Sequence, residues 1–135
     1  MSDFAKDKIT SPLSIIILVV FIFTAFNLFV FDIMVVEGHS MEPTIKPGQL
    51  IFIYRLEYGF LIPFLNKYIV LWNKPKKDEI VVLKSPEEGK VVVKRCITVS
   101  GDNVFLIGDN KSKSIDSRFY GFVSIYSLLG KVIGF

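Results

Sequence analysis

The stretch "EIVVLKSPEEGKVVVKRCITV", residues 79–99, decides the fold. Its two ends, "EIVVLK" and "VVVKRCITV", are rich in β-branched residues, which favour strands. Between them, "SPEEG" carries the Ser, Pro and Gly of a turn and has the length of a hairpin connection. The stretch therefore predicts an antiparallel hairpin.

Further strand-like segments lie on both sides of this hairpin. They are "QLIFIYR" at 49–55, "NVFLIGDN" at 103–110 and "GFVSIYSLLGKVIGF" at 121–135, separated by Gly- and Ser-bearing turns. Beyond the N-terminal third, no stretch has a convincing helical period. We therefore predict a mainly β protein, with a small antiparallel β domain over residues 34–135.

The N-terminal segment has a different character. From Leu13 to Phe31 the chain contains no charged residue, and these 19 residues would reach ~28 Å as a helix, close to the thickness of a bilayer core. A cleaved signal peptide has a shorter apolar region followed by small residues, which "FDIMVVEGH" does not offer. We expect a retained transmembrane anchor at 13–33, after a cytoplasmic segment at 1–12.

Basic residues flanking the anchor predict its orientation. Lys6 and Lys8 precede it, whereas the first basic residue after it is Lys46. Because basic flanks stay in the cytoplasm, the β domain should lie on the extracytoplasmic side of a single-pass membrane protein.

Charge and cysteine content exclude several classes of function. The net charge is +3 and the lysines are scattered over turns, so nucleic-acid binding has no support. The single cysteine, Cys96, excludes an internal disulfide and a cysteine-based metal cluster. It lies in a strand-like run and is predicted to be a small core residue. We expect no cofactor and no metal.

The segment "YGFLIPFLNKYIVLW", residues 58–72, is almost as apolar as the anchor but is interrupted by Pro63, Asn66 and Lys67. One interpretation is a pair of core strands joined by a hairpin. The other is an apolar lip that dips into the membrane surface, with Trp72 and the tyrosines at the level of the headgroups.

Ser40, within "VEGHSMEPTIKPGQ" (36–49), is a candidate nucleophile. A serine hydroxyl needs a partner that accepts its proton. His39 is the only histidine, and adjacent side chains of an extended chain point to opposite faces, so His39 should face away from Ser40. A histidine-based triad would need a second histidine.

A lysine kept neutral by burial is the alternative base, because burial disfavours the ammonium form. Most lysines after the anchor adjoin turns, whereas Lys94 lies inside "VVVKRCITV" with Val92 and Cys96 on the same face. Lys94 is thus the candidate base. The competing interpretation puts Lys94 at a sheet edge with its amine in water.

Four segments together resemble the conserved boxes of bacterial type I signal peptidases, the S26 family of Ser/Lys proteases. They are "GHSMEPT" (38–44), "PKKDEIVVLKSP" (75–86), "VVVKRCITVSGD" (91–102) and "GDNKSKSIDSRFYGFV" (108–123). Their order and the anchor before them agree with the family. The resemblance implies a fold of the signal peptidase/LexA-like type.

The resemblance also implies an activity. The protein would cleave signal peptides from exported preproteins, after small residues at positions −1 and −3, through an acyl-enzyme. Ser40 matches the nucleophile, Lys94 the general base, and Ser114 the serine whose hydroxyl orients that lysine. The implied location is the bacterial cytoplasmic (inner) membrane.

Other residues match supporting positions of the family. Asp116 and Arg118 match a structural ion pair, spaced to share one face of a strand, and Met41 matches a residue that packs the site. The backbone N–H of Ser40 would donate to the developing oxyanion. Some members add a side-chain donor two positions before the nucleophile, where this chain has Gly38.

Three aspartates, Asp102, Asp109 and Asp116, recur at intervals of seven residues. Such spacing could suggest metal ligands, but no histidine joins them. Solvated turn carboxylates are the favoured interpretation.

The sequence departs from the family in one respect. A cap-like β subdomain normally separates the last two boxes, but here only residues 103–107 lie between Asp102 and Gly108. The chain would be a minimal form lacking most of the cap. Less cover over Lys94 would leave its amine protonated near neutral pH, unless the membrane surface, the Tyr58–Trp72 segment or a partner supplied the cover.

Two alternative functions remain open. One is a non-catalytic, membrane-anchored binding module on a peptidase core, and the other is a peptidase dedicated to one secretion system. Self-cleaving repressors share the core, but they carry a DNA-binding domain where this chain has its anchor. The presence of Ser40, Lys94 and Ser114 together favours an active peptidase.

Overall fold

The computed structural model describes residues 11–62, 65 and 67–135. The chain separates into two compact units, which meet in the sequence between Val30 and Phe31. Lys6 and Lys8, which carry the prediction of orientation, lie outside the described residues, and so do Pro63 and Asn66 of the apolar segment.

The first unit contains helix α1, Pro12–Val30. Its 19 residues are long and apolar enough to cross a membrane, which is consistent with a membrane anchor. Two of its polar side chains bond within the helix, because Thr24 Oγ1 donates to the Val20 carbonyl at 2.8 Å and Asn27 Nδ2 to the Phe23 carbonyl at 2.8 Å. Such internal bonding suits a segment in hydrocarbon, where water cannot serve polar groups.

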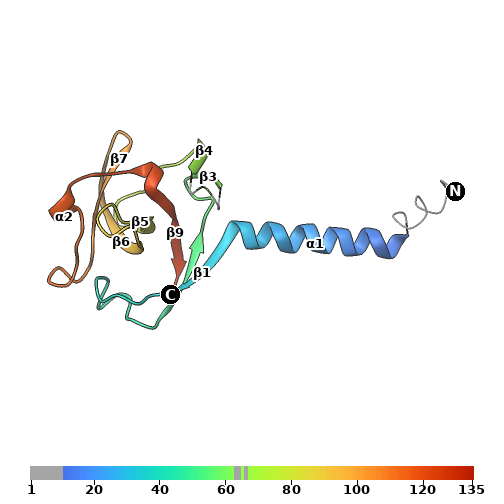
Figure 1. Ribbon diagram of the computed structural model, residues 1–135, viewed down its shortest axis with the longest axis horizontal. Coiled ribbons are helices and arrows are strands. Elements are labelled where there is room, and N and C mark those ends of the chain that lie inside the picture. Colours follow the sequence, from blue (N-terminus) through green and yellow to red (C-terminus); the bar gives the residue numbers. More distant parts are fainter. Residues whose placement is uncertain (1–10, 63–64, 66) are drawn as a thin grey trace. The chain divides into compact units, whose positions relative to one another are not determined.

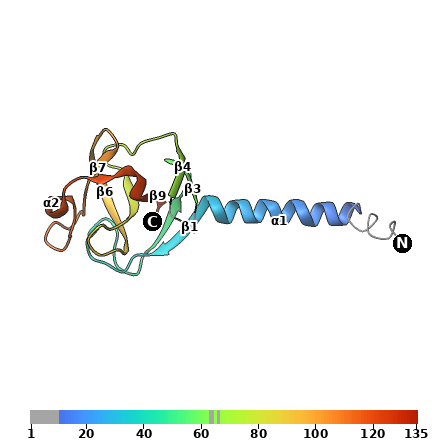
Figure 2. The ribbon, with the colours of Figure 1, turned by 45° about the horizontal axis from the view of Figure 1, so that its top comes forward.

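The second unit is an antiparallel β domain, as predicted, and it forms a half-barrel (Figures 1 and 2). Seven strands form one curled sheet in the order β1-β2-β9-β5-β6-β7-β8, and β3 and β4 form a separate pair. The strands are β1 (Phe31–Val35), β2 (Leu50–Tyr54), β3 (Gly59–Ile62), β4 (Lys67–Leu71), β5 (Ile80–Lys84), β6 (Val91–Ser100), β7 (Asn103–Ile107), β8 (Val123–Ser124) and β9 (Leu128–Gly134).

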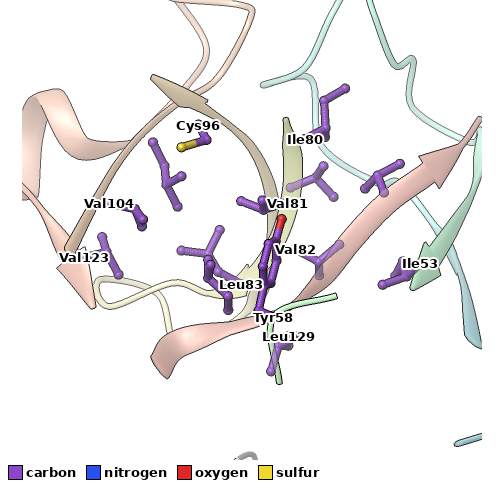
Figure 3. Close-up of a cluster of buried hydrophobic side chains, with 14 of the residues drawn as sticks. Ile53, Tyr58, Ile80, Val81, Val82, Leu83, Cys96, Val104, Val123 and Leu129 are labelled. Atoms are coloured by element: carbon purple, nitrogen blue, oxygen red, sulfur yellow. The ribbon is translucent and has the colours of Figure 1, made fainter. Parts of the chain in front are cut away.

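The hairpin predicted from residues 79–99 is confirmed. Strands β5 and β6 pair antiparallel, from Ile80 opposite Arg95 to Lys84 opposite Val91. Strand β5 lies between β9 and β6 in the sheet, and its residues Ile80–Leu83 are all buried. Figure 3 shows side chains of β5, β6 and β7 converging inside the curled sheet, with Cys96 among them. Cys96 is fully buried, so its prediction as a core residue is also confirmed.

Two single-turn helices were not predicted: α2, Ser117–Tyr120, and the 3₁₀ turn η1, Ile125–Ser127. A side chain caps each of them. The carboxylate of Asp116 accepts from the backbone N–H of Arg118, and the hydroxyl of Ser124 accepts from the N–H of Tyr126. Such local caps need no periodic apolar pattern, and the search for helical periods therefore missed both.

The apolar segment at 58–72 contributes one face to the core. Tyr58, Leu61 and Tyr68 are almost fully buried, and the Tyr68 hydroxyl donates to the Leu128 carbonyl of β9 at 2.9 Å. The predicted pair of core strands is therefore confirmed for this face of β3–β4. The opposite face of the hairpin carries exposed apolar side chains.

Leu83→Ala should test the core, because Leu83 is fully buried in the central strand. Removing its side chain leaves a cavity, and we expect a loss of about 2–5 kcal/mol in the free energy of unfolding. Denaturant titration in detergent micelles, followed by circular dichroism, measures this loss. The control Leu50→Ala alters an exposed leucine and should change stability by less than about 0.5 kcal/mol. Equal losses in both variants would contradict the described core.

Candidate functional site

Ser40 lies in the loop that joins β1 to β2, and buried neighbours hold this loop. Met41 and Ile45 are fully buried, and the Ile45 N–H donates to the Met41 carbonyl at 2.9 Å. At the base of the loop, the Val36 N–H donates to the Gln49 carbonyl at 2.9 Å. Ser40 itself is only partly buried, so the loop presents it at the surface on a fixed base.

Lys94 projects from β6 into the interior of the domain. Only 3% of its surface is exposed, and its Nζ donates to Ser114 Oγ at 2.9 Å. Burial lowers the pKa of Lys94, while the negative charge of Asp116 acts in the opposite direction. The alternative with the amine in water at a sheet edge is therefore wrong.

The expectation that the missing cap would leave Lys94 uncovered is also wrong. The chain buries this side chain with its own residues, without lipid or partner. The segment after β7 supplies part of the cover, because Ser114 and Asp116 are buried beside the amine. The short connection at residues 103–107 thus does not leave the lysine exposed.

Ser114 and Asp116 fix the position of the Lys94 amine. Ser114 Oγ donates its only proton to Asp116 Oδ2 at 2.6 Å, so toward Lys94 it can act only as an acceptor. One N–H of the amine is thereby committed to Ser114. The other substituent positions around Lys94 Nζ, including the lone pair of the neutral amine, point away from Ser114 Oγ.

Asp116 remains a carboxylate although it is fully buried. Burial alone would raise its pKa, but hydrogen bonds from Arg118, Ser114 and the N–H of Gly108 outweigh this effect and hold the pKa well below its usual range. Arg118 donates through Nε and Nη2, each at 2.8 Å. The predicted pairing of Asp116 with Arg118 is present, but the two residues lie at the start of α2, not on a strand.

Gly108 brings the serine loop against this network. A Cβ built on Gly108 would lie 2.6 Å from the Ser40 carbonyl oxygen and would collide with Ser114 Oγ. The Asn110 N–H also donates to the Ser40 carbonyl, at 2.8 Å. The backbone of Ser40 is thus adjacent to the serine that holds Lys94. Within the described part of the chain, Ser40 Oγ itself has no hydrogen bond.

Asp109 forms a second connection, which the sequence analysis missed. Arg95 of β6 donates to both of its carboxylate oxygens, at 2.8 and 2.7 Å, and Thr44 of the serine loop donates to Oδ2. The hydrogen bonds from Arg95 lower the pKa of Asp109, against the effect of burial. Asp109 therefore links the serine loop to the lysine strand. The prediction of solvated turn carboxylates is wrong for Asp109 and Asp116.

His39 and Gly38 contribute no contact to Lys94. The exposed imidazole of His39 lies 3.2 Å, through Nδ1, from a carboxylate oxygen of Glu42. Gly38 is exposed, and a Cβ built there would meet no atom within 4 Å.

A groove of about 440 Å³ leads to Ser40. One side is β1, which is the edge strand of the sheet, together with the start of the serine loop. The other side is the start of β6, where Val91–Lys94 pair with β5 but lie before the first residue that pairs with β7. Two strand edges therefore flank the groove. Its lining comprises Met34, Val35, Val36, Glu37, Gly38, Ser40, Met41, Glu88, Lys90, Val91, Val92 and Val93.

Comparison with known proteins gives one consistent family. The family described as "Signal peptidase, peptidase S26" matches residues 9–104 and 102–134, which is nearly the whole chain.

Individual relatives agree with this match. Signal peptidase I of Buchnera aphidicola subsp. Baizongia pistaciae is 38% identical over 90 residues, covering 66% of this chain and 28% of the relative. Signal peptidase I of Bacillus caldolyticus is 28% identical over 145 residues, covering 78% of this chain and 79% of the relative. The chain thus spans little more than a quarter of the Buchnera protein but most of the Bacillus protein. It belongs to the signal peptidase S26 family, as a homologue of the type I signal peptidases.

Proposed function

We propose that this protein is a membrane-anchored serine endopeptidase that cleaves signal peptides from exported preproteins, with Ser40 as nucleophile and Lys94 as general base. The observation that carries the proposal is the buried amine of Lys94, hydrogen-bonded to Ser114 beside the backbone of Ser40. A lysine with a lowered pKa can hold a neutral amine, and a neutral amine can accept the proton of a serine.

The reaction would proceed in two halves. Neutral Lys94 accepts the proton of Ser40 as Oγ attacks the scissile carbonyl carbon, and the Ser40 N–H donates to the developing oxyanion. The protonated Lys94 then gives this proton to the leaving amine as the C–N bond breaks. Water, deprotonated by Lys94, attacks the acyl-enzyme, and the proton returns to Ser40 Oγ when the ester bond breaks.

Ser114 and Asp116 would act as positioning residues in this reaction. Ser114 holds one N–H of the amine, so that the lone pair remains available to Ser40. Asp116 determines that Ser114 accepts from Lys94, and Arg118 keeps Asp116 ionised. Met41, which follows Ser40 in the chain, is fully buried, and a Cβ built on Gly38 would meet open space.

The groove that leads to Ser40 suits an extended peptide. A substrate segment could pair with the free edges of β1 and early β6, and its scissile bond would then lie at Ser40. The type I signal peptidases among the relatives support signal peptides as the substrate class. The helix α1 would hold the enzyme in the bacterial cytoplasmic membrane, with the β domain on the extracytoplasmic side.

A non-catalytic binding module is the second candidate, and a peptidase dedicated to one secretion system is a narrower form of the first. The burial of Lys94 argues against the binding module. Burying an amine is unfavourable, and a protein that only binds peptides gains nothing from it.

Cleavage of a preprotein with an Ala-x-Ala site, in lipid vesicles, tests the proposal. We expect Ser40→Ala and Lys94→Met each to reduce kcat/KM by roughly 10³-fold or more, because the two groups act as a unit. His39→Ala should cleave at close to the wild-type rate, since its imidazole contacts Glu42. No cleavage by folded wild-type protein would overturn the general peptidase and favour the binding module or the dedicated peptidase.

Gly108→Ala tests the approach of the serine loop to the lysine network. The added Cβ would collide with Ser114 and press on the Ser40 carbonyl, so we expect kcat to fall roughly 10- to 100-fold. Gly134→Ala is the matched control, because its Cβ would make only an ordinary contact at 3.5 Å with Phe52. Circular dichroism checks that both variants fold. Equal kcat values would contradict the proposed arrangement.

The pH dependence of kcat/KM tests the role of Lys94 as base. The rate should rise with pH as Lys94 loses its proton, with a midpoint below the ordinary lysine value of about 10.4, because burial lowers the pKa of Lys94. The charge of Asp116 raises that pKa, so Asp116→Asn should move the midpoint to lower pH while reducing the maximal rate. Lys84→Met removes an exposed lysine and should leave the profile unchanged. A midpoint that stays in place in Asp116→Asn would contradict the assignment.

A further inference from the structure

Charged side chains border the groove that leads to Ser40. Glu37 lies on the β1 side of the groove, and Glu88 and Lys90 lie on the other side, between β5 and β6. All three side chains are exposed, and none of them forms an ion pair with another described residue. Two carboxylates against one ammonium make the lining of the groove negative. The groove therefore offers unpaired charge to a peptide that lies in it.

The turn that carries Glu88 is held in place by Ser85, which is buried. The Ser85 N–H donates to the Lys90 carbonyl at 2.8 Å, and its own carbonyl accepts from the Gly89 N–H at 3.0 Å. The Glu88 N–H donates to Ser85 Oγ at 3.3 Å. Gly89 has a φ of 66°, a conformation that glycine adopts at little cost. The backbone of Glu88 is thus fixed before a ligand arrives, which lowers the entropic cost of binding one.

The charge of Glu88 acts on the buried amine of Lys94. Besides burial, three charged groups affect the pKa of Lys94: Asp116 and Glu88 raise it, and Arg118 lowers it. Asp116 and Arg118 pair with each other at 2.8 Å, and Asp116 is fully buried. Among these three groups only Glu88 borders the groove. A ligand in the groove can therefore reach the amine electrostatically through Glu88.

On the basis of the proposed function, we propose that Glu88 pairs with a basic side chain of the substrate and makes the groove selective for lysine or arginine near the scissile bond. An extended peptide between β1 and the start of β6 directs alternate side chains to one wall, so a basic residue at a suitable position faces Glu88. An acidic residue at that position is repelled. Lys90 opposes the preference, because it carries the opposite charge on the same side of the groove.

Pairing with the substrate also affects the proposed base. Glu88 raises the pKa of Lys94, so a cation beside the Glu88 carboxylate weakens this effect and favours the neutral amine. The pH dependence of kcat reports the complex with substrate, whereas that of kcat/KM reports the free enzyme. A basic substrate should therefore shift the midpoint of kcat to lower pH than a neutral substrate does, while the midpoint of kcat/KM stays the same for both.

Peptides that differ in one residue test the preference. Fragments with an Ala-x-Ala site carry Lys, Gln or Glu at each nearby position other than the two alanines. Cleavage by the full chain is measured in uncharged detergent micelles, so that no lipid charge attracts the peptides. At one or two positions we expect kcat/KM to be roughly 5- to 10-fold higher with Lys than with Glu.

Variants of the turn assign the preference to Glu88. Glu88→Gln should abolish the preference and move the midpoint of kcat/KM to lower pH, and Glu88→Lys should reverse the preference. Lys90→Gln should increase it, because the competing cation is gone. Glu87→Gln is the matched control: Glu87 is an exposed acid of the same turn but does not line the groove, so the preference should not change.

Binding separates this inference from the proposed function. Fluorescence anisotropy of labelled peptides with the Ser40→Ala chain gives the same comparison without cleavage. Tighter binding of Lys peptides that depends on Glu88, in a wild-type protein that cleaves none of them, would overturn the peptidase and support the inference. Cleavage and binding with equal preference for Lys and Glu at every position would overturn the inference alone. So would a preference for Lys that persists in Glu88→Gln.

Discussion

The burial of one amine is the constraint on which the site depends. Lys94 can serve as a base near neutral pH only if water is kept from it, and the half-barrel provides this by turning residue 94 of β6 inward. The segment after β7 then completes the enclosure through Ser114 and Asp116. A carboxylate so close to the amine would normally favour its protonated form, but Arg118 and the N–H of Gly108 engage that carboxylate. The effect of burial therefore outweighs that of Asp116, and the pKa of Lys94 is lowered.

The second requirement of the proposed reaction is that the loop between β1 and β2 holds Ser40 in a fixed place. Three contacts meet this requirement: the buried side chains of Met41 and Ile45, the hydrogen bond from Asn110 to the Ser40 carbonyl, and the carboxylate of Asp109 between Thr44 and Arg95. The first contact joins the serine loop to the core, and the other two join it to residues that lie far from it in the sequence. The lysine strand and the serine loop are consequently parts of one rigid arrangement, although 54 positions separate Ser40 from Lys94.

The sequence predicted most strands of the β domain, the β5–β6 hairpin and the unusual position of Lys94, because each depends on short-range patterns of β-branched and turn residues. It did not predict β1, whose first residues, Phe31–Ile33, fall within the expected anchor at 13–33. It did not predict the link through Asp109, since the hydrogen bond from Thr44 connects residues 65 positions apart and no local pattern marks it. It also misjudged the cover of Lys94. That prediction counted residues missing from a cap, whereas the cover depends on how the 108–116 segment folds back over β6, which only the three-dimensional path determines. Asp116 was placed on a strand because its spacing of two residues from Arg118 matches the alternation of a strand, whereas Asp116 is the N-cap of α2.

The enclosed lysine also ties the stability of the domain to pH. In the unfolded chain Lys94 would bind its proton up to the ordinary lysine pKa of about 10.4, whereas in the folded domain burial lowers that pKa. Between the two values the unfolded chain holds the additional proton, so the contribution of Lys94 to the free energy of unfolding increases as the pH rises, and is least favourable below the folded pKa. Deprotonation of the amine at alkaline pH thus also removes the unfavourable free energy of burying its charge.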